Sequence, residues 1–150
     1  MSAILTFDDS LWPLLLLRIT GVMTNEQLVE FFQRSESLLE RQEKYVSITD
    51  VSQAGTPTLA QCRQVAEWLR QHSARTREYL LCNIIIVTSA PLRLSTSLVF
   101  HLVPPPMHHA AVSNMASALE VAQRRLVEAR LDSAAERVRR HFATAGFPPG

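Results

Sequence analysis

Glycine and cysteine are both scarce in this chain, and their scarcity disfavours several kinds of catalytic site. The 150 residues include four glycines, which are too scattered to form either of the phosphate-binding patterns GxGxxG and GxxxxGK. The two cysteines, Cys62 and Cys82, are too few and too far apart for a zinc site. Both fall on apolar faces of predicted elements, where burial suppresses the thiolate that a nucleophile requires. Nucleotide enzymes and thiol enzymes are therefore disfavoured.

Long apolar runs and a strong excess of either charge are also missing. The most apolar stretch, residues 80–87, is far shorter than the roughly 20 residues that span a bilayer. The N-terminal segment lacks the basic region of a secretory signal, so we expect a cytoplasmic protein with no membrane partner. The formal net charge is +1, and aromatic residues are not interleaved with the arginines, which makes nucleic acid an unlikely partner.

Histidine offers one candidate metal site, and its geometry is unfavourable. His108 and His109 are adjacent and follow the proline run 104–106. Neighbouring side chains on an extended chain point to opposite sides, so these two imidazoles cannot easily hold one ion. The sequence therefore predicts no metal site, no cofactor and no catalytic residues.

Strands and helices alternate along the chain, as the periodicity of the apolar residues indicates. The predicted strands are 4–7, 14–19, 45–51, 80–88 and 110–113. The predicted helices are 24–40, 56–75, 89–103 and a segment from 114 that breaks or continues near 132 and runs to 145. Alternation of this kind predicts one α/β domain with a mixed, mostly parallel sheet of four or five strands, packed helices and an extra C-terminal helix.

Three segments of this pattern resemble the STAS domain, the fold of bacterial anti-sigma-factor antagonists, and more loosely its SEC14-like relatives. They are the strand pair ending in Arg18-Ile19-Thr20-Gly21, the strand Val46 to Asp50 followed by a helix, and the buried strand Asn83 to Thr88. The resemblance implies a STAS-like domain over residues 1–131. Residues 132–150 are then a helical extension and tail, dispensable for the fold, whose thin apolar stripe could dock on a second copy in a homodimer.

The start of the second predicted helix departs from the STAS pattern. Antagonists of this family carry an Asp-Ser-Ser-Gly type motif there, where a kinase phosphorylates a serine, whereas residues 55–59 read Gly-Thr-Pro-Thr-Leu. We expect Thr56 to cap the helix before a proline at its first position, and Thr58 to be the likelier residue for modification. Together with Arg63 and Arg70 they form the expected partner-binding or regulatory site.

The resemblance implies a non-enzymatic bacterial regulatory or protein–protein interaction module. The alternative is an enzyme or a binding protein for a small anionic or lipid-like ligand, with a pocket near the strand ends formed by Asp50, Ser89 and Arg93. Asp50 can also simply hydrogen-bond the turn that follows it. A closed apolar pocket under the helix 89–103 would favour the ligand alternative, and an exposed apolar patch over a solid core would favour a protein partner.

Overall fold

A five-stranded sheet organises the computed structural model, which describes residues 2–145. The strands are β1 (Ile4–Leu11), β2 (Leu14–Gly21), β3 (Tyr45–Ala54), β4 (Leu80–Ile86) and β5 (His108–Val112). They lie in the order β1-β2-β3-β4-β5, with β1 antiparallel to β2 and all other neighbours parallel. The α/β class and the mixed, mostly parallel sheet expected from the sequence are confirmed.

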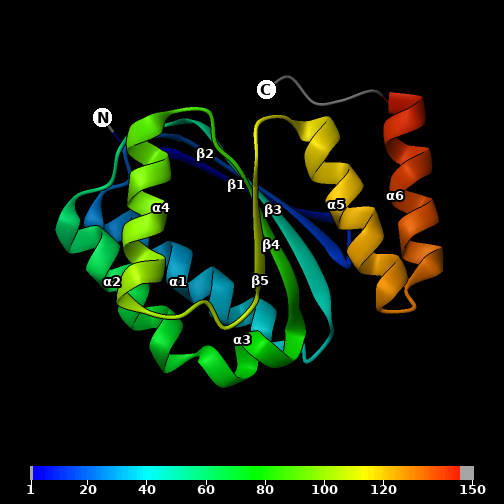
Figure 1. Ribbon diagram of the computed structural model, residues 1–150, viewed down its shortest axis with the longest axis horizontal. Coiled ribbons are helices and arrows are strands. Elements are labelled where there is room, and N and C mark those ends of the chain that lie inside the picture. The colour runs from blue at the N-terminus through cyan, green and yellow to red at the C-terminus, as the bar shows by residue number, and fades with distance from the viewer. Residues whose placement is uncertain (1, 146–150) are drawn as a thin grey trace.

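The helices form two layers, one on each face of this sheet. They are α1 (Asn25–Glu40), α2 (Leu59–Gln71), α3 (Ser73–Tyr79), α4 (Ala90–Leu102), α5 (Met115–Glu128) and α6 (Asp132–Ala145). From β2 to β5, each strand lies beside the strand that precedes it in the sequence, so the strands are added in one direction across the sheet. Right-handed crossovers therefore put all the connecting helices on one face. Figure 1 shows α1 to α4 on that face and α5 with α6 on the other.

Several predicted boundaries differ from the structure, and the start of the second helix has a clear local cause. The second predicted helix begins at Leu59 instead of Pro57, because Thr58 caps it. This helix also does not run on to Arg75: it ends at His72, and the separate helix α3 follows. Strand β5 begins at His108, two residues before its predicted start.

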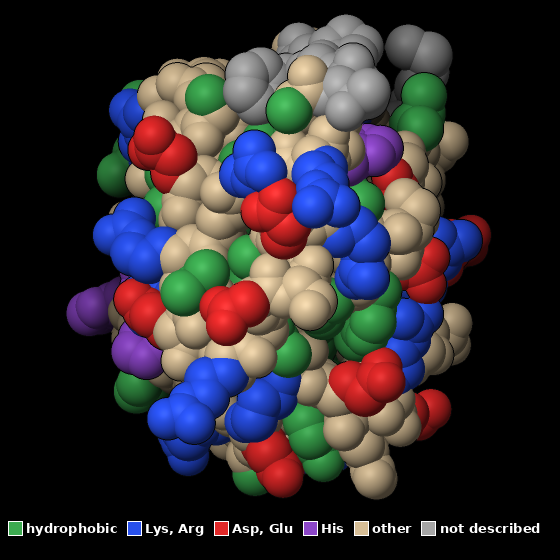
Figure 2. Space-filling view, turned by 90° about the vertical axis from the view of Figure 1, so that its right-hand side faces the viewer, with side chains coloured by type: hydrophobic (Ala, Val, Ile, Leu, Met, Phe, Trp, Pro, Cys, Tyr) green, Lys and Arg blue, Asp and Glu red, His purple; other side chains and the backbone are tan. Residues whose placement is uncertain are grey.

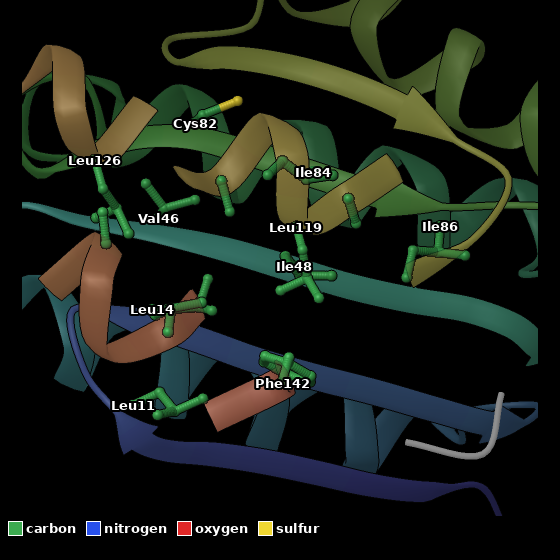
Figure 3. Packing of buried hydrophobic residues seen from close by; sticks show 14 residues of the cluster. Leu11, Leu14, Val46, Ile48, Cys82, Ile84, Ile86, Leu119, Leu126 and Phe142 are labelled. Carbon is green, nitrogen blue, oxygen red and sulfur yellow. The ribbon is translucent and has the colours of Figure 1, made fainter. Parts of the chain in front are cut away.

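The face of the sheet under α5 and α6 is packed solid. Alternate residues of β2, β3 and β4 point to this face and meet leucines and alanines of α5 (Figure 3). Ala118 and Ala122 are fully buried, and side chains this small allow α5 to lie close against β3 and β4. The buried members of this cluster are Leu11, Leu14, Val46, Ile48, Cys82, Ile84, Ile86, Ala118, Leu119, Ala122, Leu126, Ala135, Val138 and Phe142.

Helix α6 contributes to this core, although the sequence favours a peripheral extension over residues 132–150. Val138 is fully buried, and Phe142 lies beside Leu11 and Leu14 of the β1–β2 hairpin (Figure 3). Arg137 donates a hydrogen bond to the backbone carbonyl of Trp12 in the hairpin turn. The outward side of this layer instead carries interspersed charges of both signs (Figure 2). The apolar stripe of α6 is therefore used within the same chain and is not left for a second copy.

Candidate functional site

The opposite face of the sheet, under α1, α2 and α4, contains open space beside its own apolar clusters, and we call it the hollow face. Two adjoining chambers of about 210 and 220 Å³ lie between the helices and the sheet. They share walls made by Phe31 of α1, Val65 of α2, Val99 of α4 and Ile85 of β4. Ile85 is only half-buried although its strand is internal to the sheet, because its side chain faces this space.

Polar side chains line the centre of the hollow face, where the solid face has only apolar ones. The hydroxyls of Ser47 and Thr49 on β3 donate to Oδ1 of Asn83 on β4, over 2.9 and 3.3 Å. Ser47 and Asn83 are direct neighbours in the parallel register. On the other face the corresponding positions of these two strands are Val46, Ile48, Cys82 and Ile84. The two faces of β3 and β4 therefore differ in chemistry as well as in packing.

The chambers hold no ionisable group other than phenol and thiol. Among the described residues, those lining them include no Asp, Glu, Lys, Arg or His. Burial raises the pKa of Tyr45, at the first chamber, to about 12. Burial also raises the pKa of the Cys62 thiol at the second chamber, and a hydrogen bond with Ser95 offsets part of that effect. Both groups are thus neutral at physiological pH.

Thr58 caps the second helix, whereas the sequence predicts Thr56 as the cap. The hydroxyl of Thr58 accepts a hydrogen bond of 3.0 Å from the Gln61 backbone N–H, and the Gln61 side chain accepts one from the Thr58 N–H in return. Thr24 and Gln27 form the same reciprocal arrangement at the start of α1. Thr56 lies exposed two residues before the cap.

Replacing Thr58 by Ala should lower the free energy of unfolding by about 1 kcal/mol, the usual cost of losing a side-chain N-cap. Thr56→Ala is the matched control and should leave stability unchanged, because the Thr56 side chain makes no hydrogen bond to a described residue. Urea denaturation of the two variants measures both values. A larger loss for Thr56→Ala would place the helix start at Pro57.

The two arginines of the predicted site lie at different ends of α2. Arg63 is exposed on the second turn, near Thr58. Arg70 lies seven residues further along, about 10 Å by the helical rise. Its guanidinium pairs with Glu67 and donates to the carbonyl of Leu102 over 3.0 Å. The structure therefore groups Arg63 with the threonines and separates Arg70 from them.

The three residues of the alternative ligand site are not brought into one pocket. Asp50 is buried on the α5 side, where it accepts hydrogen bonds from the backbone and hydroxyl of Ser52 and lies 3.4 Å from the guanidinium of Arg18. Ser89 caps α4, and Arg93 donates to the carbonyl of Val87. None of these residues lines either chamber.

Four exposed apolar side chains lie near the carboxyl ends of the parallel strands. Because α1, α2 and α4 follow β2, β3 and β4, the N-terminal ends of these helices all lie at the carboxyl edge of the sheet. Val22, Val29, Leu59 and Leu94 lie there with exposed fractions of 47%, 52%, 52% and 70%. We call these four residues the apolar edge.

Sequence reasoning missed the polar cluster in the chambers and the role of Gln61. The Thr-x-x-Gln spacing of residues 58–61, a repeat of residues 24–27, is a signal that could have located the true cap. Asn83 within a strongly apolar strand was the corresponding signal for the cluster, since an amide in a strand expected to be internal needs hydrogen-bond partners. Nothing comparable marks the chambers themselves, which depend on side chains from several elements.

Two kinds of feature are absent from residues 2–145. No group of three or more His, Cys, Asp or Glu side chains is arranged to hold a metal ion there. None of the described helices combines the length and apolar character needed to cross a bilayer.

Comparison with known proteins bears on the fold. No protein-family model and no curated protein matches the sequence. A solved structure of an uncharacterised DUF3478-family protein with a SpoIIAA-like fold, from Shewanella loihica PV-4, is similar with a TM-score of 0.59 and 14% identity, over 81% of this chain and 94% of that one. An anti-sigma factor antagonist from Mycobacterium paratuberculosis is similar with a TM-score of 0.54 and 9% identity, over 81% of this chain and 95% of that one. The chain therefore has a SpoIIAA-like fold.

Proposed function

We propose that this chain is a non-enzymatic regulatory module of the bacterial cytoplasm that binds a protein partner through the apolar edge. The observation that carries the proposal is the exposure of Val22, Val29, Leu59 and Leu94 together at the carboxyl edge of the sheet. Large apolar side chains gathered on a surface are typical of protein interaction sites. The similar antagonist structure supports a regulatory role of this kind.

The charges near the apolar edge indicate the chemistry of the partner. Arg63 is exposed, one helical turn after Leu59, and pairs with no described acidic side chain. A partner surface with an apolar centre and a carboxylate facing Arg63 would complement this arrangement, since charged groups at the rim of an interface direct orientation and association rate.

Phosphorylation at the edge of this surface is the regulatory part of the proposal. Both Thr56 and Thr58 are exposed, but the Thr58 hydroxyl is committed to capping α2. Thr56 is therefore the better candidate for modification, which reverses the sequence-based order. A phosphate there would lie near the exposed N–H groups and positive dipole end of α2, which tolerate added negative charge.

The engagement of the reactive side chains supports the non-enzymatic part of the proposal. Asp50, the best-placed carboxylate, is hydrogen-bonded to Ser52 and lies beside Arg18. Cys62 and Cys82 are buried, and burial raises the pKa of each thiol. These groups support the structure and are poorly suited to acid–base or nucleophilic chemistry.

Site-specific photo-crosslinking in the native host tests the proposal. A photoreactive residue at Leu59 or Leu94 should crosslink the same protein, whereas one at Val127, an equally exposed apolar position on α5, should not. Leu59→Glu should weaken the captured complex by at least about 30-fold, as expected for a central interface residue. It should leave stability unchanged, because a carboxylate is favourable in a first helical turn. Crosslinking confined to Val127, or an unweakened Leu59→Glu complex, would exclude the apolar edge.

A further inference from the structure

We infer that the two chambers between the sheet and α1, α2 and α4 form a binding site for an uncharged, mostly apolar small molecule whose polar group hydrogen-bonds to Asn83. This inference is independent of the protein-partner proposal, because none of the four residues of the apolar edge lines either chamber. It also differs from the ligand alternative drawn from the sequence, whose residues Asp50, Ser89 and Arg93 line neither chamber.

The size of the site suits a small organic molecule. Each chamber, at about 210 or 220 Å³, is larger than an engineered apolar cavity of about 150 Å³ that binds benzene. The shared walls at Phe31, Val65 and Val99 place the chambers next to each other, so a longer ligand can extend from one into the other. Native cores contain few voids of this size, because unfilled space loses packing contacts.

Asn83 supplies the polar anchor of the site. Its Oδ1 already accepts hydrogen bonds from Ser47 and Thr49, and it lines both chambers. Its Nδ2 makes no hydrogen bond to any described residue, so this amide retains donor capacity toward the cavity. A ligand carbonyl, ester or ether oxygen would complete its hydrogen bonding.

A second unpartnered polar group lies in the wall of the first chamber. Thr76 is 2% exposed, and its Oγ1 has no hydrogen-bond partner among the described residues. Buried hydroxyls without a partner are uncommon in native proteins, and each calls for an explanation. Asn83 lies on the sheet side and Thr76 on the α3 side of this chamber, which is consistent with a site for a molecule that carries polar atoms.

The absence of charge from the walls restricts the ligand class. A carboxylate, sulfonate or phosphate in these chambers would lose its hydration without gaining a cationic partner among the described lining residues. Burying an unpaired ion is strongly unfavourable. Fatty-acid anions and nucleotides are therefore excluded, and neutral ketones, esters or alcohols with an aromatic, terpenoid or acyl body fit the site.

Two fluorescent probes with the same ring system test the charge rule on the intact protein. N-phenyl-1-naphthylamine is neutral, and 1-anilinonaphthalene-8-sulfonate adds one sulfonate to the same anilinonaphthalene skeleton. We expect the neutral probe to saturate at one molecule per chain and the anionic probe to bind at least about tenfold more weakly. At pH 8, 2-decanone should displace the neutral probe and decanoate should not. Equal binding of the two probes, or no saturable binding of the neutral one, would overturn the inference.

Matched valine substitutions locate the probe. Val65→Phe fills the junction of the chambers and should weaken binding of the neutral probe at least about tenfold, whereas Val127→Phe on the exposed face of α5 should have no effect. Val99→Phe is the second filling variant if Val65→Phe does not fold, as judged by circular dichroism. Unchanged binding by a folded filling variant would place the probe elsewhere and refute the site.

Replacement of Asn83 tests the anchor separately. Asn83→Leu should reduce displacement by 2-decanone about fivefold to tenfold, because the ketone loses its donor, and should leave affinity for the hydrocarbon-rich neutral probe within about twofold. Asn83→Ala serves the same purpose if the leucine variant fails to fold. Displacement by 2-decanone at the wild-type level in a folded variant would show that Asn83 does not hold the polar group.

Discussion

Phe142→Ala is expected to destabilise the protein by about 3–5 kcal/mol, a large part of the 5–15 kcal/mol that stabilises a typical domain. The Phe142 ring is buried against Leu11 and Leu14 of the β1–β2 hairpin, so its removal leaves a cavity in the solid core. Urea denaturation measures the loss. Arg139→Ala on the exposed side of the same helix is the control, and should cost less than about 1 kcal/mol because it removes a surface ion pair with Glu136.

Deletion of residues 132–150 extends this test to the whole of α6. Besides losing its own buried side chains, the truncated protein would expose the side of the hairpin that α6 covers. We expect it to be unfolded or to melt well below the full chain in circular dichroism. A truncated protein of full stability would restore the sequence-based division into a domain of residues 1–131 and a dispensable extension.

Gln61→Leu is expected to cost about 2–3 kcal/mol, the second largest loss among these point substitutions, because it removes the hydrogen bonds of a buried amide to two part-buried backbone groups. The Gln61 side chain is 5% exposed, accepts from the Thr58 N–H and donates to the Met23 carbonyl over 2.9 Å. It thereby connects the start of α2 to the segment before α1. Thermal and urea unfolding measure the loss.

Gln64→Leu is the matched control for this glutamine, because Gln64 is exposed on the same helix. It should change the free energy of unfolding by less than about 0.5 kcal/mol, as surface substitutions usually do. Equal effects of the two substitutions would mean that Gln61 contributes only helix propensity, and that the hydrogen bond to Met23 adds nothing to the stability of this edge.

The two faces of the sheet differ in packing and in polarity. The α5–α6 face has apolar side chains from both layers in contact, and it supplies most of the buried cluster that holds β1 to β4 together. The opposite face contains the polar cluster of Ser47, Thr49 and Asn83 beneath helices that do not fill the space. A solid face can maintain the fold while the hollow face accepts a ligand, because stability does not then depend on occupancy.

The sequence by itself determined the class and order of the fold. Apolar residues with a period of two or of 3.6 reveal strands and helices directly, since these periods follow from backbone geometry. The run of isoleucines in residues 84–86 predicts an internal strand, and β4 lies inside the sheet. Alternation of strands and helices then leaves few arrangements for a parallel sheet with right-handed crossovers. The cap at Thr24 was equally accessible, because its partner Gln27 is three residues away.

Tertiary structure alone decided the features that depend on distances between elements. The stripe of α6 looks thin in sequence, yet Val138 and Phe142 are buried because the hairpin of β1 and β2 lies opposite them. Asp50, Ser89 and Arg93 all lie near strand ends, but Asp50 points to the α5 face while the other two belong to the α4 side. The chambers exist because the side chains between α1, α2, α4 and the sheet leave space unfilled. No local pattern encodes that space, because it is bounded by side chains that meet only after the chain has folded.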